Sequence, residues 1–231
     1  MSNYRVIFFD LDHTLWDYDK NSVEALSDLY EKYELKNTSC SSLNHFLDTF
    51  TKVNSKLWNN YNKGHIDREQ IRESRFTNIL KTYGINDKQM ALSMSEEYIE
   101  ECPKKTHVFP YTFDALNYLK QKYELYILTN GFDDVQQVKL SNAQLLPYFR
   151  GMITSDSSGH RKPSREIFHY ALNLAGAVSS ESIMIGDNPN TDIQGAHAAS
   201  IDSVLFNPLR KKHQSTVKHE ISCLSELMEI L

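Results

Sequence analysis

Glycine and proline are scarce in this chain of 231 residues, which contains 8 glycines and 6 prolines. Average usage of roughly 7% glycine and 5% proline would give about 16 and 12. The first hundred residues hold Gly64, Gly84 and no proline, and the rest of the chain holds all the others. This composition excludes collagen-like, glycine-linker and proline-rich disordered chains. It also indicates a long helical stretch early in the chain and more turns later.

Cysteine, long apolar runs and excess positive charge are also lacking. The three cysteines, Cys40, Cys102 and Cys223, form no C-x-x-C pair, which favours reduced thiols over a disulfide framework or a zinc site. Apolar runs stay far below the ~20 residues of a membrane span, and the N-terminus does not resemble a signal peptide. The net charge of -5 provides no broad basic surface for nucleic acid. We therefore expect a cytoplasmic globular protein, monomeric or weakly dimeric, with neither a membrane nor a nucleic-acid polymer as its partner.

Five short runs of β-branched and aromatic residues predict the strands of a parallel sheet. The first run is Val6–Phe9, and the others lie at 125–128, 152–154, 183–185 and 204–206. Continuous apolar runs of this length are typical of strands buried on both faces. Helical patterns between them, at 113–120 and 167–175, complete βαβ units. The fold class predicted is therefore α/β, and a helix is expected to start at Pro163.

The block between the first two predicted strands has a different pattern. It shows no strand-like alternation from residue 17 to about 106, and the run from Asp67 to Gln70 predicts a helix N-cap with a capping box. We interpret residues 17–106 as a helical domain inserted into an α/β domain made of residues 1–16 and 107–231, with the aromatic residues packing its core. Four helical faces are predicted by Val23, Leu26, Leu29, Tyr30 and Tyr33; by Leu43, Phe46, Leu47, Phe50, Val53, Leu57 and Trp58; by Phe76, Ile79, Leu80 and Tyr83; and by Met90, Met94 and Tyr98.

Two acidic residues, Asp10 and Asp12, follow the first predicted strand. Side chains two residues apart on an extended chain point to the same side. The two carboxylates are therefore expected to face one space at the carboxyl end of a central strand. Open α/β sheets bind their ligands at this edge.

Polar residues follow the other strands as well. Thr129-Asn130-Gly131 offers a hydroxyl group and backbone N–H groups that suit an anionic oxygen. Lys162 precedes Pro163 and can bring an ammonium group to the same edge. Asp187 adds a third carboxylate after Gly186, and Asp192 follows five residues later.

Converging acids repel one another unless a cation lies among them. Oxygen ligands without nearby histidine or cysteine favour Mg²⁺ over zinc. A lysine and a threonine beside such a cation would hold an anion against it. The residues therefore predict metal-assisted phosphoryl transfer with a carboxylate available as nucleophile.

These motifs, in this order, resemble the four motifs of the haloacid dehalogenase-like hydrolases. The resemblance covers essentially the whole chain and implies a Rossmann-like, doubly wound parallel sheet with an inserted helical cap. The motifs are Asp10-x-Asp12-x-Thr14, Thr129-Asn130-Gly131, Lys162-Pro163 and Gly186-Asp187-(x)4-Asp192.

The resemblance also implies a role for each site residue. Asp10 would be the nucleophile that forms an aspartyl-phosphate. Asp12 would protonate the leaving oxygen and then activate water. Phosphate would be bound by Thr129, Asn130 and Lys162, Mg²⁺ by Asp10, the backbone carbonyl of Asp12 and Asp187, with Asp192 as outer support.

Asp12 distinguishes branches of this family. The dehalogenases lack the second aspartate and the metal, because expelling a halide requires no proton donor. Phosphonate-cleaving relatives use a cap lysine as an imine, and that alternative stays open because the predicted cap contains Lys32, Lys36, Lys52 and Lys56. A phosphatase is the favoured function.

Aromatic residues offer a hypothesis for the substrate, a small phosphorylated metabolite. Trp16, Tyr18 and Trp58 could stack on a base, or they could pack the core of the cap. Their surroundings are similar to those in the pyrimidine 5′-nucleotidase branch, which predicts a pyrimidine nucleoside 5′-monophosphate. The alternatives are a phosphatase of sugar phosphates or of N-acylneuraminate 9-phosphate, a phosphosugar mutase, and a non-catalytic binding protein on the same fold.

Overall fold

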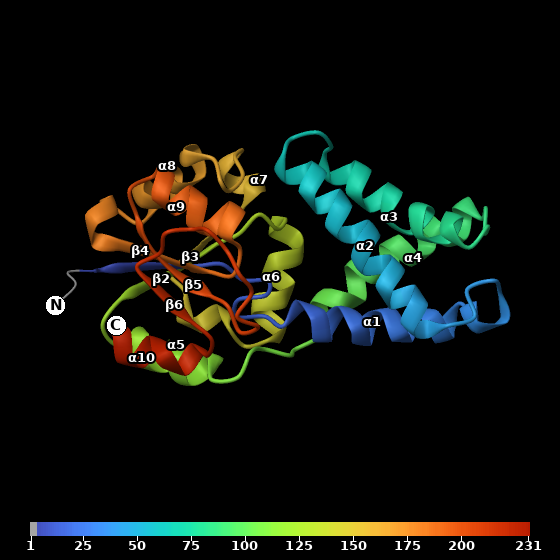
Figure 1. Ribbon diagram of the computed structural model, residues 1–231, viewed down its shortest axis with the longest axis horizontal. Helices are drawn as coiled ribbons and strands as arrows, with labels where there is room; N and C mark the ends of the chain where they lie inside the picture. Colours follow the sequence, from blue (N-terminus) through green and yellow to red (C-terminus); the bar gives the residue numbers. More distant parts are fainter. Residues whose placement is uncertain (1–3) are drawn as a thin grey trace. The chain divides into compact units, whose positions relative to one another are not determined.

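The computed structural model describes residues 4–231, which form two compact units (Figure 1). The chain up to Tyr18 and Thr106–Leu231 make one unit, and Asp19–Lys105 makes the other. Within the described residues, each helix is too short or too polar to cross a bilayer.

The first unit is built on a parallel sheet of six strands in the order β3-β2-β1-β4-β5-β6. The central strand β1 is completely buried, as its unbroken apolar sequence predicts. The sheet extends from β1 in both directions, so the carboxyl ends of β1 and β4 form the edge at which open α/β sheets bind their ligands. This is the predicted α/β fold with a Rossmann-like, doubly wound sheet. Its strands are β1 (Val6–Phe9), β2 (Glu124–Leu128), β3 (Gly151–Ile153), β4 (Ser182–Gly186), β5 (Asp202–Phe206) and β6 (His219–Ile221).

Helices cover both faces of this sheet. In Figure 1, α8 and α9 lie on one side of the strands, and α5 and α10 lie on the other. Val6 and Phe8 of β1 pack with Phe168 and Ala171 of α8 and with Ala196 of α9 in one buried cluster. The helices of this unit are α5 (Thr112–Leu119), α6 (Asp133–Asn142), α7 (Ser155–Ser158), α8 (Arg165–Leu174), α9 (Gln194–Ala198) and α10 (Leu227–Ile230).

Among the differences from the sequence-based prediction, two have a clear physical reason. Strand β6 was not predicted, because it is three residues long and only Ile221 in it is buried. Helix α8 begins at Arg165 rather than at Pro163. The backbone of Ser164 between them is extended (φ -60°, ψ 138°), so helical geometry starts only after it.

The second unit is built mainly from four α-helices, as its apolar spacing predicts. Asp67 and Gln70 form the predicted capping box: Gln70 N donates to Asp67 Oδ1 (2.8 Å) and Asp67 N donates to Gln70 Oε1 (2.9 Å). Phe50, Phe76 and Tyr98 pack with ring centroids 5.1–6.1 Å apart in its buried core. These aromatic residues therefore stabilise the helical unit, as interpreted from the sequence. Its helices are α1 (Tyr18–Lys32), α2 (Leu43–Asn62), α3 (Arg68–Thr82) and α4 (Lys88–Glu101).

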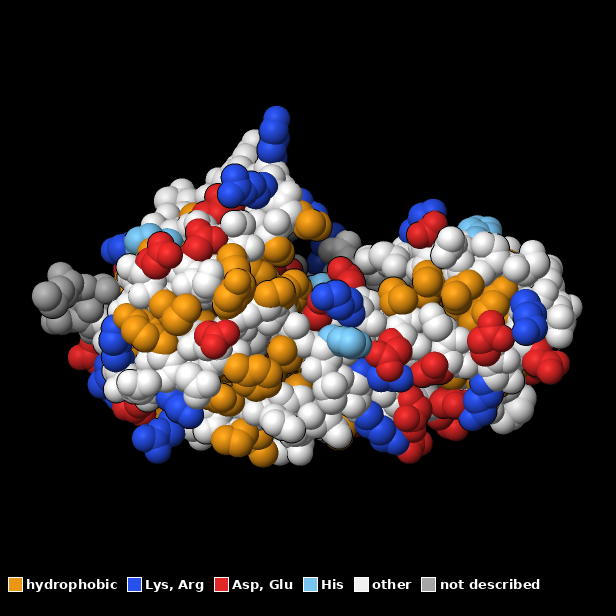
Figure 2. Space-filling model, turned by 90° about the horizontal axis from the view of Figure 1, so that it is seen from below, with side chains coloured by type: hydrophobic (Ala, Val, Ile, Leu, Met, Phe, Trp, Pro, Cys, Tyr) orange, Lys and Arg blue, Asp and Glu red, His pale blue; other side chains and the backbone are white. Residues whose placement is uncertain are grey.

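Charges of both signs are mixed on the surface. On the face drawn in Figure 2, lysine and arginine side chains are interspersed with aspartate and glutamate. In the helical unit, Lys105 Nζ lies 2.8 Å from carboxylate oxygens of both Glu24 and Asp28. Pairs of this kind neutralise cations locally instead of gathering them into a basic patch.

Candidate active site at the carboxyl end of the central strand

Asp10 is the first residue beyond β1. Its backbone N–H donates to Ile185 O of β4 (2.9 Å), so its position is fixed by the sheet. A tight turn follows, in which the carbonyl of Leu11 accepts hydrogen bonds from the backbone N–H groups of Leu15 (3.0 Å) and Trp16 (2.9 Å). The strand and the turn together place Asp10 beside the carboxyl end of β4.

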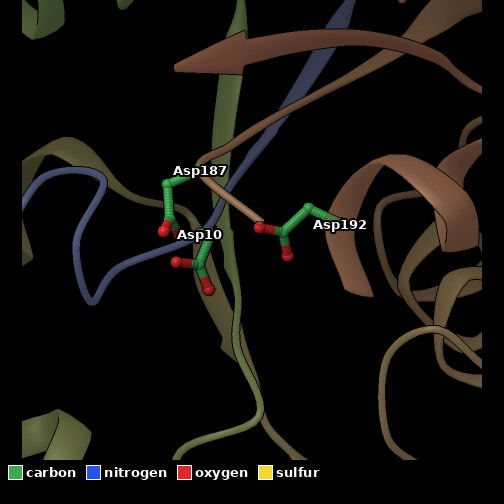
Figure 3. Close-up of side chains that lie close together, drawn as sticks. All are labelled: Asp10, Asp187 and Asp192. Carbon is green, nitrogen blue, oxygen red and sulfur yellow. The ribbon is translucent and has the colours of Figure 1, made fainter. Parts of the chain in front are cut away.

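Three carboxylates, from Asp10, Asp187 and Asp192, point toward one another in Figure 3. One oxygen of each lies within 4.8 Å of the others. Asp187 directly follows β4, and Asp192 lies in a π-helical turn, Pro189–Ile193. Gly186 permits this approach, because a Cβ atom there would overlap the Asp192 carboxylate. The structure thus brings Asp192 beside Asp10 and Asp187.

Lys162 lies against two of these acids. Its Nζ is 2.6 Å from Asp10 Oδ1 and 2.7 Å from Asp192 Oδ1, and it donates to Leu128 O at 2.7 Å. Burial would lower the pKa of Lys162, but the two carboxylates raise it above its usual value. The ammonium is therefore charged and compensates part of the negative charge of the cluster.

The remaining negative charge helps to raise the pKa values of Asp10 and Asp187. Burial, opposed by Lys162 and reinforced by Asp192 and Asp12, raises the pKa of Asp10 to about 7. Burial together with Asp10 and Asp192 raises the pKa of Asp187 well above its usual value. A group of three oxygen donors with excess negative charge fits a hard divalent cation such as Mg²⁺.

The carboxylate of Asp12 lies outside this three-acid cluster and has its own partners. Asp12 Oδ1 is 2.6 Å from Lys139 Nζ, and Asp12 Oδ2 accepts a hydrogen bond from Gln136 Nε2 at 2.9 Å. Burial alone would raise the pKa of Asp12, but Lys139 and the hydrogen bonds from Lys139 and Gln136 hold it below its usual value. Asp12 is therefore ionised in this arrangement.

Gln136 and Lys139 were not predicted as site residues. They lie three residues apart on α6, on the same face as Leu140, and all three are buried. The sequence did contain a signal for them: two polar residues occupy core positions of the helix that follows Thr129-Asn130-Gly131.

Thr129 and Asn130 have different roles in the structure. Thr129 Oγ1 accepts hydrogen bonds from Gly131 N (3.1 Å) and Gln136 Nε2 (2.8 Å), which leaves its hydroxyl proton for an anion. The side chain of Asn130 instead holds the backbone of Lys162: Oδ1 accepts from Lys162 N (2.7 Å) and Nδ2 donates to Lys162 O (2.9 Å). A phosphate contact from Asn130, as expected from the sequence, would therefore come from its backbone N–H.

The aromatic candidates also differ in position. Trp16 is fully buried, with Lys139 Nζ 4.5 Å from its ring centroid, so it has no exposed face to offer a substrate. Of the two alternatives for Trp16, stacking on a base and packing in a core, its burial favours packing. Tyr18 is half-buried, and its ring lies 6.1 Å from Trp16. Trp58, in the helical unit, is half-buried edge-on to Tyr61 at 5.5 Å.

Comparison with known proteins identifies the family. The family model described as haloacid dehalogenase-like hydrolase matches residues 7–206, most of the chain. The chain belongs to the haloacid dehalogenase-like hydrolases. All four sequence motifs that resemble this family lie within the matched residues.

Relatives within the haloacid dehalogenase-like hydrolases match the chain over nearly its full length. The HAD-hydrolase YfnB of Bacillus subtilis is 30% identical over 235 residues, covering 100% of this chain and 97% of YfnB. The pyrimidine 5′-nucleotidases YjjG of Escherichia coli (29% identical; 97% of this chain, 96% of YjjG) and PynA of Streptococcus pneumoniae (27%; 99% and 95%) are also similar. The crystal structure of YfnB bound to magnesium superposes with a TM-score of 0.89 at 28% identity and covers 98% of each chain.

Proposed function

We propose that this protein is a Mg²⁺-dependent phosphatase of small phosphomonoesters that acts through an aspartyl-phosphate. The observation that carries the proposal is the position of Asp10, with Lys162 2.6 Å away and the carboxylates of Asp187 and Asp192 beside it. Asp12 adds the proton donor and acceptor that phosphate ester hydrolysis requires and halide expulsion does not.

The residues that would hold Mg²⁺ are the carboxylates of Asp10 and Asp187 and the backbone carbonyl of Asp12, with Asp192 beside them. A divalent cation supplies charge neutralisation and polarisation of a phosphoryl oxygen. The YfnB structure bound to magnesium supports this assignment by analogy.

In the first half of the reaction, a carboxylate oxygen of Asp10 attacks phosphorus while the bond to the ester oxygen breaks. Asp12, after taking up a proton, gives it to that leaving oxygen. The hydroxyl proton of Thr129 and the ammonium of Lys162 stabilise the phosphoryl oxygens. The products of this half are the alcohol and the phosphorylated Asp10.

In the second half, water attacks the phosphorus of the aspartyl-phosphate. Asp12, again ionised beside Lys139, accepts a proton from that water. The bond between phosphorus and the Asp10 oxygen breaks, inorganic phosphate leaves and the carboxylate of Asp10 is restored.

For the substrate we propose a pyrimidine nucleoside 5′-monophosphate. The similarity to YjjG and PynA over nearly the full length of all three chains supports this choice. Tyr18 and Trp58 are the proposed contacts to the nucleoside. A cytoplasmic, monomeric or weakly dimeric enzyme belongs to the same proposal.

The test measures phosphate release with and without Mg²⁺, first from p-nitrophenyl phosphate and then from nucleoside monophosphates and sugar phosphates. Asp10→Asn is expected to lose activity by at least about 1000-fold, since it lacks the nucleophile. Asp114→Asn, at an exposed position of α5, is the matched control. Full activity of Asp10→Asn or in excess chelator would overturn the phosphatase assignment. A preference for sugar phosphates would overturn only the substrate.

A further inference from the structure

Helix α6 presents two buried polar side chains to Asp12. Gln136 is 0% and Lys139 is 5% exposed, and between them they contact both carboxylate oxygens of Asp12. The residues are separated by more than 120 positions in the sequence, so only the folded chain brings them together. A carboxylate held at both oxygens cannot rotate without losing a charge-assisted contact.

Lys139 also lies over two aromatic rings. Its Nζ lies 4.5 Å from the ring centroid of Trp16 and 5.8 Å from that of Tyr18. Aromatic faces attract a cation but leave little freedom to a buried ammonium. Because Trp16 is itself fully buried, the position of Lys139 is fixed by packing as well as by charge.

Gln136 connects Asp12 to the hydroxyl of Thr129. The same nitrogen, Nε2, donates to Asp12 Oδ2 at 2.9 Å and to Thr129 Oγ1 at 2.8 Å. The amide must present this nitrogen to Asp12, since the opposite orientation would place an oxygen against a carboxylate. Gly131 leaves the required space, because a Cβ atom there would overlap the Gln136 amide.

We propose that Lys139 and Gln136 are positioning residues that hold the Asp12 carboxylate and the Thr129 hydroxyl in the geometry needed for proton transfer at the phosphoryl group. This inference rests on the proposed phosphatase function. Lys139 acts through Asp12 and does not touch the substrate. A displacement of a reacting group by about 1 Å can cost about 100-fold in rate, so the loss of Lys139 should reduce kcat far more than it changes KM.

The test is a double-mutant cycle between Lys139 and Asp12, assayed by phosphate release from a nucleoside monophosphate. Lys139→Met is expected to lower kcat by about 10- to 100-fold with KM changed less than about 3-fold. In the Asp12→Asn background the same change should cost less than about 2-fold, because the group on which Lys139 acts is already altered. Lys139→Arg, which keeps the charge, should restore part of kcat.

A second measurement distinguishes positioning from general damage. If Asp12 is misplaced as the base, acid-quenched Lys139→Met should contain more phosphorylated Asp10 than wild type at steady state. Lys120→Met is the matched lysine control, because Lys120 is exposed and its Nζ also lies 4.5 Å from a ring centroid, that of Tyr148. Gln136→Leu is compared with Gln137→Leu, since Gln137 is the exposed neighbour on α6.

The outcomes of this test separate the positioning role from the phosphatase function. An equal loss of kcat in both backgrounds, or wild-type kcat in Lys139→Met, overturns the positioning role while the phosphatase function stands. If Lys139→Met does not fold, unchanged kcat in both Lys139→Arg and Gln136→Leu overturns it, and a lowered kcat in folded Gln136→Leu supports it. Absence of phosphate release from the wild-type chain overturns the proposed function, and the positioning role with it.

Discussion

At the scale of single residues, Asp10 and Asp187 bind protons more tightly in the folded chain than in the unfolded one. Burial and neighbouring acids raise the pKa of Asp10 from 3.8 to about 7 and raise the pKa of Asp187 in the same direction. Between about pH 4 and pH 7 the unfolded chain loses the proton of Asp10 while the folded chain retains it. The stability that Asp10 contributes is therefore present below about pH 4 and is lost as the pH rises through 7, and the raised pKa of Asp187 acts in the same direction.

This linkage predicts how the thermal stability depends on pH in a chelator. The Tm of the wild-type protein should fall between pH 5.5 and pH 8, and Asp187→Asn should make the fall smaller because it removes one of the competing charges. A difference of about 1 kcal/mol corresponds to roughly 2–4 °C in a chain of this size. Thermal unfolding followed by circular dichroism measures it, with Asp114→Asn as control. An identical pH profile for Asp187→Asn and the control would contradict the prediction.

Gly186 is a second residue whose replacement has a defined result. A side chain there would overlap the Asp192 carboxylate and push it away from Lys162. Gly186→Ala is therefore expected to destabilise the protein by about 1–3 kcal/mol, the usual cost of overpacking, and to lower phosphatase activity. Gly151→Ala is the control, since the nearest atom to its Cβ is 3.4 Å away in the Tyr126 ring. Equal Tm values for the two variants would show that the Asp192 carboxylate moves aside without any loss of stability.

At the scale of elements, patterns within short segments were predictable and contacts between distant segments were not. Strand β1 and the capping box at Asp67 follow from neighbouring residues, so the sequence alone predicts them. Asp10 and Asp187 directly follow β1 and β4, and parallel strands end at one edge of a sheet. Lys162, in contrast, lies between α7 and α8 and reaches Asp10 through its long side chain. The contacts of Lys139 with Asp12 depend on the packing of α6, which no local pattern specifies.

Asn130 joins two of these elements, the loop after β2 and the segment before α8. Its two hydrogen bonds to the backbone of Lys162 are each expected to contribute about 1 kcal/mol net. Asn130→Ala should therefore lower the stability by about 1–3 kcal/mol and reduce kcat by displacing Lys162. Thermal unfolding and steady-state kinetics measure both effects. Asn142→Ala, at an exposed position of α6, should leave both unchanged; a kinetic loss in Asn130→Ala without any loss of stability would argue for direct phosphate binding instead.

At the scale of the whole molecule, the proposed chemistry belongs to one unit, and of the two proposed nucleoside contacts Tyr18 belongs to the same unit and Trp58 to the other. Asp10, Lys162 and Asp187 all belong to the α/β unit, whereas Trp58 belongs to the helical unit. The contribution of Trp58 to substrate selection can therefore be tested independently of the proposed chemistry.

Trp58→Ala is expected to lower kcat/KM for a pyrimidine nucleotide by about 5- to 100-fold, in line with about 1–3 kcal/mol for an aromatic residue stacked on a base. Its kcat/KM for p-nitrophenyl phosphate should change less than about 2-fold, because the groups that act on phosphate are untouched. Phe113→Ala, at an exposed aromatic position of the α/β unit, is the control. Parallel losses for both substrates would assign Trp58 to the packing of the helical unit alone.

The chain leaves the α/β unit and returns to it at neighbouring points. Asp17 N donates to His107 O (3.0 Å), Phe109 N donates to Leu15 O (2.9 Å), and Trp16 pairs with Val108 in an antiparallel bridge. An insert whose two ends are already held together imposes little additional constraint on its host, whatever its own length. The insert can therefore be replaced in evolution without rebuilding the α/β unit, so that proteins with the same core can select different substrates. A protein engineer could use the same junction to graft a foreign cap between Tyr18 and Thr106.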